Sequence, residues 1–217
     1  MALEPVDELL NKQIIELSYV VVNSKRGYRA IKKIIDISLA LIGLLIGIPI
    51  VIVFSFVIKL ESQGPAIYKQ ERLGKDGKSF IIYKMRSMFI DAENNGPKWA
   101  DKHDNRITRV GQFIRKARLD EIPQLFNILK GEMSVVGPRP ERSHFTYKFN
   151  RDIPGFANRL LVKPGLTGLA QVNGGYDITP EEKFRLDMEY IEKMSLIMDF
   201  KIIWKTLTIV LTGHGAR

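Results

Sequence analysis

Two neighbouring carboxylates and one rigidly presented arginine are the residues of this chain best suited to chemistry. Asp120 and Glu121 are adjacent, and Arg139 lies between two prolines, Pro138 and Pro140. An ionised carboxylate can act as a covalent nucleophile at phosphorus. Proline restricts its own backbone and that of the preceding residue, and a guanidinium held in this way suits bidentate phosphate binding. The combination points to phosphoryl chemistry on a highly charged substrate.

The same two carboxylates also fit an ordinary helix start. Asp120 would cap a helix that runs to Leu129, with Pro123 tolerated in its first turn and Gly131 ending it. Acidic residues at a helix N-terminus are stabilised by the helix dipole and require no function. In isolation, the residue types leave both interpretations open.

Other cations could complete a phosphate site. Lys84 and Arg86 leave one face of a predicted strand, and Arg115 precedes the carboxylate pair by about one helical turn. Most lysines and arginines in a basic protein are merely solvated. These three are therefore candidates for phosphate binding, while Arg139 is the cation that the local sequence singles out.

Asp187 is a third carboxylate of interest. It lies on a helix predicted to start at Pro180, within an apolar stripe of Phe184, Met188, Ile191 and Met194. A carboxylate on the buried side of a helix is costly unless it is paired or bound to a metal. We therefore expect either an ion pair with an arginine or a role at a hard cation such as Mg²⁺.

A long uncharged segment precedes all of these residues. Ile37 to Ile58 contains no charged side chain, and a straight helix of this length rises about 33 Å, enough to cross a bilayer core. Pro49 lies near its middle, where proline removes a backbone donor and collides with the carbonyl four residues earlier, so we expect a kink. Basic residues flank both ends, namely Lys25, Arg26, Arg29, Lys32 and Lys33 before it and Lys59, Lys69 and Arg72 after it.

This charge pattern distinguishes two topologies. A single membrane span should carry its lysines and arginines mainly on one side. A helix that enters, breaks at Pro49 and returns to the same face explains both the proline and the two-sided charge, because each arm would be only about 15–18 Å long. We predict the re-entrant hairpin, with the span as the alternative, and expect Gly43 and Gly47 to let its arms pack closely.

Three parts are predicted along the chain. Residues 1–30 form an amphipathic extension, residues 31–60 the re-entrant membrane hairpin, and residues 61–217 a cytosolic catalytic domain. The predicted fold class is mixed α/β and mainly helical with a short β-hairpin, with the N-terminal helix-break-helix beneath the catalytic domain.

Local signals predict most elements of the catalytic part. Two strands, Ala66–Leu73 and Ser79–Arg86, should form the hairpin around Asp76-Gly77. Helices should follow Thr108, Thr179 and Asp199 as N-caps and cover 143–150. The last helix has an apolar face suited to the core or to a membrane interface. Residues 91–105 read as a loop, and 163–177 as a loop with a short strand.

Composition narrows the partners. The net charge is +9 with a pI near 9.6, which suits an anionic partner such as nucleic acid, an acidic membrane or a phosphorylated substrate. Aromatic residues are not interleaved with basic ones as in a stacking platform, so we expect no nucleic acid. The chain has no cysteine, which excludes disulfides and thiolate metal sites.

A set of sequence motifs resembles one known family. The matching segments are Lys32-Lys-Ile-Ile-Asp36, Gly64-Pro65, Gln70-Glu-Arg-Leu-Gly74, Tyr83-Lys-Met-Arg-Ser-Met88, Leu119-Asp-Glu-Ile-Pro-Gln124, Gly131-Glu-Met-Ser-Val-Val-Gly-Pro-Arg-Pro140, Lys163-Pro-Gly-Leu-Thr-Gly168 and Gln171-Val-Asn173. They cover about residues 31–212. The chain resembles the bacterial sugar transferase family, the monotopic polyprenyl-phosphate phosphoglycosyl transferases.

The resemblance implies an enzyme at the cytoplasmic face of the bacterial inner membrane. It would transfer a sugar 1-phosphate from a UDP-sugar to polyprenyl (undecaprenyl) phosphate and release UMP. This is the first membrane step of exopolysaccharide, capsule, O-antigen or glycoprotein glycan assembly. Homodimers are compatible with the family. The alternative is a catalytically inactive membrane adaptor of a glycan-assembly complex.

The resemblance also implies roles for particular residues. Asp120 matches a nucleophile that forms a covalent phosphosugar intermediate, assisted by Glu121. Phosphate-binding positions are assigned to Lys84, Arg86, Arg115 and Arg139, Mg²⁺ ligation to Asp120, Glu121 and Asp187, and the nucleotide-sugar loop to Thr167, Gln171 and Asn173. Some members break the re-entrant helix at a Ser-Pro pair, whereas this chain has Ile48-Pro49.

Overall fold

The computed structural model describes residues 26–94, 96, 104–174 and 178–212. Most of the predicted extension, at 1–25, lies outside the described residues. The elements, in chain order, are α2 (Arg26–Glu61), β1 (Ile67–Leu73), η1 (Lys75–Gly77), β2 (Ser79–Met85), α3 (Arg109–Lys116), η2 (Leu119–Gln124), α4 (Leu125–Leu129), β3 (Ser134–Val136), α5 (Ser143–Asp152), η3 (Phe156–Leu161), β4 (Gly165–Thr167), α6 (Leu169–Gly174), α7 (Pro180–Lys193) and α8 (Leu196–Thr212).

The protein is mainly helical with little sheet, as predicted. Strands β1 and β2 form the expected antiparallel hairpin, in which Leu73 faces Ser79 next to the turn and Ile67 faces Met85 at the open end. A second, parallel pair joins β3 to β4. It brings the segment before Arg139 alongside 165–167, where the sequence indicated one short strand without its partner.

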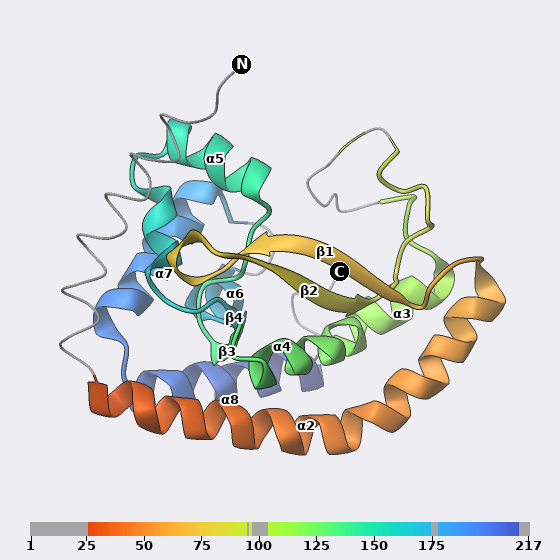
Figure 1. Cartoon of the computed structure of the whole chain (residues 1–217), viewed down its shortest axis with the longest axis horizontal. Helices are drawn as coiled ribbons and strands as arrows, with labels where there is room; N and C mark the ends of the chain where they lie inside the picture. The colour runs from red at the N-terminus through yellow and green to blue at the C-terminus, as the bar shows by residue number, and fades with distance from the viewer. Residues whose placement is uncertain (1–25, 95, 97–103, 175–177, 213–217) are drawn as a thin grey trace.

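Helix α2 runs without interruption along one side of the protein. Figure 1 shows it as an arc, with the other elements on its concave side. Pro49 lies inside the helix, and the predicted break is therefore a bend within one continuous helix. Among the described residues, α2 alone is long and apolar enough to cross a membrane. Whether it enters and leaves by the same face stays a prediction.

Two glycines of α2 pack against the segment that follows Asp120, and not against a second membrane arm as predicted. A Cβ added at Gly43 would lie 2.8 Å from Leu125 Cδ1, and one at Gly47 would lie 2.5 Å from Ile122 Cγ2. Both partners follow Asp120 by a few residues. The absence of side chains on this stripe of α2 lets η2 and α4 approach the helix closely.

The predicted caps are borne out at two helices and wrong at two. Thr108 accepts from the backbone N–H of Gly111, and Thr179 forms the complete capping box with Glu182. Asp120 instead lies inside the first turn of η2, whose N-cap is Arg118. Asp199 lies inside α8, where burial turns its carboxylate toward neighbouring elements and away from the backbone N–H groups of its own helix.

The contacts of Asp199 join α8 to the start of α2. Its carboxylate accepts from Lys32 Nζ at 2.9 Å, Tyr28 Oη at 2.8 Å and Tyr190 Oη at 2.8 Å. Asp36 makes a related link, because it accepts from the backbone N–H of Val135 in β3. Charged residues of α2 thus fasten its first turns to the rest of the protein.

Candidate active site

A cavity of ≈ 460 Å³ brings all four predicted phosphate-binding residues together. It lies where the hairpin, the α3–η2 turn and the loop after β3 meet. The predicted site residues on its wall are Lys84, Arg86, Arg115, Asp120, Arg139 and Gln171. The sequence spreads these residues over nearly ninety positions, and the fold gathers them around Asp120.

The turn that carries Asp120 is conformationally unusual. Arg118 has φ 58° and ψ 17°, a left-handed conformation that a non-glycine residue adopts at a cost. This residue reverses the chain between α3 and η2. The reversal places Asp120, which is 8% exposed, at the cavity wall.

Glu121 forms ion pairs with two of the cations at the site, Lys84 and Arg139. Its Oε1 lies 3.2 Å from Lys84 Nζ and 2.5 Å from Arg139 Nη2. Burial by itself would raise the pKa of Glu121, but Arg139 and Lys84 together hold that pKa well below its usual range. Glu121 is therefore an ionised group that fixes both cations beside Asp120.

Asp120 is in the opposite electrostatic situation. Burial and the adjacent charge of Glu121 raise its pKa above the ordinary aspartate value, against the opposing effects of Lys84, Arg139 and Arg115. A carboxylate that is poorly solvated and little stabilised as an anion is a more reactive nucleophile than a fully hydrated one. The two neighbouring carboxylates thus differ in their electrostatic environment, which favours the ionised form of Glu121 and opposes that of Asp120.

Arg115 and Arg86 differ in what they can offer a substrate. Arg115 lines the cavity, and its Nη1 is buried with no hydrogen-bond partner among the described residues. The guanidinium of Arg86 binds the carbonyls of Ser62, at 2.7 Å, and of Gln63. Arg86 therefore anchors the end of α2, and we leave it out of the proposed phosphate site.

Asp187 is buried as predicted, and its partner is an arginine. Its Oδ2 lies 2.6 Å from Nε of Arg159, and both side chains are almost fully buried. In the part of the chain that the structure describes, no group of three or more His, Cys, Asp or Glu residues could hold a metal ion. Of the three predicted ligands, Asp120 and Glu121 lie together, and Asp187 is occupied by Arg159.

The three residues of the predicted nucleotide-sugar loop do not converge. Gln171 borders the cavity, and its Nε2 donates to the Leu166 carbonyl at 2.9 Å. Thr167 is buried and shares a hydrogen bond with Thr206 of α8. Asn173 of α6 accepts a hydrogen bond of 2.6 Å from Lys205 of α8, and both residues line a separate pocket away from the cavity of Asp120.

The cavity has further charged walls that sequence reasoning missed. Glu141 is buried and holds Lys183, and together with Arg159 and Arg72 this lysine keeps the pKa of Glu141 at about 2, although burial opposes the shift. Arg142 forms two hydrogen bonds of 2.9 Å to Glu93. Glu141 and Arg142 directly follow Pro140, so the rigid loop around Arg139 was the available signal.

Comparison with known proteins shows which family this chain belongs to. A model of the family described as bacterial sugar transferase matches residues 27–213. The chain therefore belongs to the bacterial sugar transferase family, and the predicted class of enzyme, a phosphoglycosyl transferase, is confirmed at the level of the family.

Three relatives show how far the similarity extends. The chain is 58% identical over 143 residues to a Bacillus subtilis protein provisionally named undecaprenyl-phosphate N-acetylgalactosaminyl 1-phosphate transferase, covering 66% of this chain and 80% of the relative. It is 45% identical over 193 residues to the UDP-N-acetylgalactosamine-undecaprenyl-phosphate N-acetylgalactosaminephosphotransferase of Aeromonas hydrophila, covering 88% and 46%. It is 39% identical over 190 residues to the UDP-glucose:undecaprenyl-phosphate glucose-1-phosphate transferase of Caulobacter vibrioides, covering 85% and 71%. The chain thus spans about half the length of the Aeromonas relative.

Proposed function

We propose that this protein transfers a sugar 1-phosphate from a UDP-sugar to undecaprenyl phosphate and releases UMP. The observation that carries the proposal is a buried Asp120 on the wall of a cavity that Lys84, Arg115 and Arg139 also line. The names of the relatives agree with a reaction of this kind. The proposed place in biology is the first membrane step of exopolysaccharide, capsule, O-antigen or glycoprotein glycan assembly.

The proposed reaction has two displacements at one phosphorus. A carboxylate oxygen of Asp120 attacks the phosphorus that bears the sugar, and the bond to the bridging oxygen breaks, so UMP leaves with that electron pair. The resulting aspartyl phosphosugar is then attacked by a phosphate oxygen of undecaprenyl phosphate. The bond to Asp120 breaks, and the carboxylate is regenerated as the lipid diphosphate sugar forms.

The cations act on charge that moves during these steps. Lys84 and Arg139, held by Glu121, would offset the negative charge of the diphosphate and of departing UMP. Arg115 would add a third positive charge at the cavity wall. Because Glu121 keeps two of these groups in place before substrate arrives, little reorganisation is needed at the moment of reaction.

We also propose that the reaction uses Mg²⁺. Magnesium is usually held by one or two carboxylates together with substrate phosphates. Asp120 and the Glu121 oxygen that does not pair with Lys84 and Arg139 would hold the ion, whereas Asp187 faces Arg159. When bound, the ion would supply positive charge to the diphosphate. Loss of UMP release on chelation, and its recovery on adding Mg²⁺, is the expected result, and undiminished release in chelator would contradict it.

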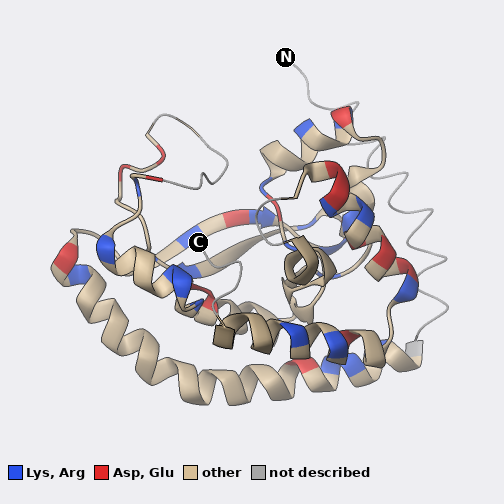
Figure 2. Cartoon of the chain, turned by 180° about the vertical axis from the view of Figure 1, so that it is seen from behind, with Lys and Arg blue, Asp and Glu red and all other residues tan. Residues whose placement is uncertain are grey.

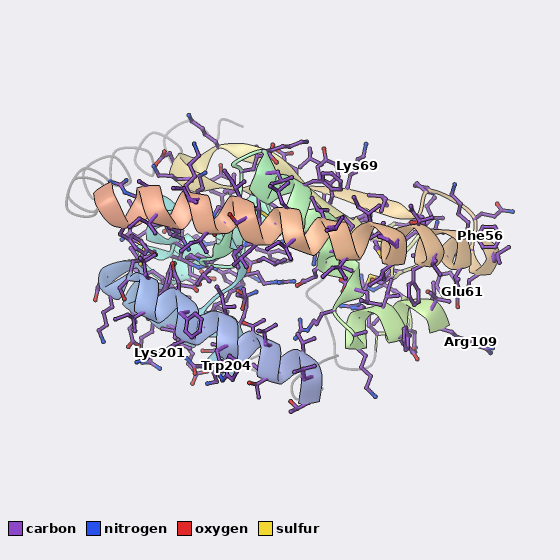
Figure 3. The ribbon with its side chains drawn as sticks, turned by 90° about the horizontal axis from the view of Figure 1, so that it is seen from below. Phe56, Glu61, Lys69, Arg109, Lys201 and Trp204 are labelled. Carbon is purple, nitrogen blue, oxygen red and sulfur yellow. The ribbon has the colours of Figure 1, made fainter. Side chains whose placement is uncertain are left out.

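The apolar surface supports attachment to a membrane. Figure 2 shows that the middle of α2 carries no charged residue, and only 17% of its most apolar stretch is buried within the protein. Figure 3 looks onto α2 and α8 together, with Trp204 and Lys201 on α8. Tryptophan and lysine are typical of the boundary between lipid and water. We propose that this side lies in the cytoplasmic leaflet of the inner membrane and that α2 enters and leaves through one face.

UMP release from a panel of UDP-sugars with undecaprenyl phosphate tests the proposal. The relatives above are named for N-acetylgalactosamine and for glucose, so the panel starts with these two donors. We expect release that requires Asp120. The alternative, an inactive adaptor in a glycan-assembly complex, predicts no release with any donor.

A further inference from the structure

A buried ion pair lies outside the catalytic cavity, and the mechanism above does not use it. Asp187 of α7 and Arg159 of η3 bring their side chains together at 2.6 Å, and these side chains are only 2% and 4% exposed. Burying two charges has a desolvation cost that the attraction between them only roughly offsets, so such a pair is weak evidence for a stabilising role. Its other contacts indicate a different purpose.

Arg159 is held on three sides. Its Nε meets Asp187, its guanidinium carbon lies 4.8 Å from the ring centre of Phe156, and its Nη2 donates to the backbone carbonyl of Arg139 at 2.9 Å. A planar guanidinium offers several donors in a fixed geometry. The carboxylate and the ring therefore orient the donor that reaches Arg139.

The carbonyl bound by Arg159 belongs to the loop that enters the active site. Pro138 and Pro140 are buried on either side of Arg139, and the proline ring after Arg139 limits the backbone of Arg139 as well. The Arg139 side chain continues to Glu121 at 2.5 Å, beside Asp120. One unbroken series of contacts thus runs from α7 to the catalytic pair.

We propose that the Asp187–Arg159 pair is a positioning device: it fixes the Arg139 carbonyl and thereby aims the Arg139 guanidinium at Glu121 and at the diphosphate of the substrate. This role rests on the proposed function, since it presumes that Arg139 binds the diphosphate. In this role Asp187 helps to orient the loop that carries Arg139. A pair that served stability alone would have no reason to act through Arg139.

Two variants separate positioning from stability. Arg159→Lys keeps a cation for Asp187 but replaces a rigid guanidinium, whose Nε and Nη2 reach the two acceptors separately, with a single flexible ammonium that lacks this geometry. Asp187→Asn keeps the shape and removes the charge that orients Arg159. The matched control is Glu189→Gln, which removes an exposed ion pair with Lys193 from the same helix α7.

The experiment measures equilibrium binding of UDP and UMP release on the full chain in detergent or nanodiscs, with Arg139→Ala as the background for a double-mutant cycle. We expect Arg159→Lys and Asp187→Asn to weaken UDP binding and lower UMP release about 10- to 100-fold, and Glu189→Gln to match the wild type. In the Arg139→Ala background the same changes should have almost no further effect on UDP binding, because the group they position is gone.

Three outcomes decide the question. Effects that add fully to those of Arg139→Ala, or folded variants that bind UDP like the wild type, would overturn the positioning role while leaving the proposed function intact. Non-additive losses in UDP binding would support the role even if the correct donor sugar had not been found. A wild-type protein that neither binds UDP nor releases UMP would refute the proposed function, and the positioning role with it.

Discussion

The cavity and the underside of the protein, which is the face formed by α2 and α8 (Figure 3), differ in which side chains they present. At the cavity, carboxylates are buried and matched with cations, as Glu121 is with Lys84 and Arg139. On the underside, large apolar side chains such as Leu45 and Trp204 are 79% and 65% exposed. In water the second arrangement is unfavourable. This contrast is what the proposed function requires, with charged substrates at the cavity and lipid at the apolar side.

The two regions meet at one joint, which is the close contact of α2 with η2 and α4. Gly43 and Gly47 of the apolar helix contact Leu125 and Ile122, which follow Glu121 by four residues and by one residue. The position of Asp120 relative to the apolar helix therefore depends on this contact.

Asp120→Asn should have the largest effect. It removes the proposed nucleophile and nearly preserves the shape of the side chain, so UMP release should fall by about 10⁴-fold or more. The fraction of protein in membranes should not change, because the apolar surface is untouched. Activity near that of the wild type would remove Asp120 from this role.

Lys84→Ala should lower kcat/KM by about 10²- to 10³-fold, because a positioned cation is lost from the diphosphate and from Glu121. Lys69→Ala is the matched control on the same hairpin. Lys69 is exposed and lies 6.0 Å from the ring centre of Tyr83, so its removal should leave the rate nearly unchanged. Equal losses from the two variants would mean that the general charge of the hairpin, and no specific contact, drives activity.

Leu45→Lys tests the apolar surface. A lysine at the centre of a membrane segment costs about 2.5–3.5 kcal/mol, which corresponds to roughly a hundredfold change in partitioning. The same substitution at Ile81, 41% exposed on β2, should leave partitioning unchanged. Sedimentation with lipid vesicles measures both. A Leu45→Lys protein that sediments like the wild type would contradict the assignment of this surface to lipid.

Gly47→Ala tests the joint. The added methyl group would meet Ile122 Cγ2 at 2.5 Å, whereas a Cβ at Gly27 of the same helix would meet nothing within 4 Å. We expect the resulting shift of η2 to lower kcat by about tenfold, with membrane partitioning unchanged. Gly27→Ala should behave as the wild type. A similar rate in both variants would show that the close approach at Gly47 does not position Asp120.

The pH dependence of kcat/KM should show the smallest effect. Burial and Glu121 raise the pKa of Asp120, so the ionised form is lost as the pH falls through this raised value, and activity should decline at a higher pH than an ordinary aspartate near 3.9 would give. Glu121→Gln removes the adjacent negative charge and should move this decline to lower pH. A decline at or below the ordinary value in the wild type would contradict the electrostatic division of the pair.

The features that could be predicted from the sequence are those that depend on residues close together in the chain. Asp120 and Glu121 are neighbours, Arg139 is held by its own two prolines, and Thr179 caps its helix through contacts within one turn. Each of these features depends on residues a few positions apart, so it can be recognised before the fold is known. The family resemblance rested on the same local segments.

What the sequence left open depends on packing between distant segments. The partner of Asp187 is Arg159, 28 positions earlier, and Arg86 binds carbonyls at the end of α2. The glycines of α2 were expected to let two membrane arms pack closely, yet Gly47 and Gly43 face residues 75 and 82 positions later. The periodicity of a sequence indicates which face of a helix is buried, but it does not identify the residues that pack against that face.

The central claim is that Asp120 carries the sugar phosphate during turnover. The most direct test mixes the wild-type protein with its UDP-sugar in the absence of undecaprenyl phosphate, quenches the mixture rapidly and maps the peptides by mass spectrometry. The account predicts a phosphosugar adduct on Asp120 that disappears when undecaprenyl phosphate is added. Accumulation of lipid-linked product with no adduct on Asp120 at any time would contradict it.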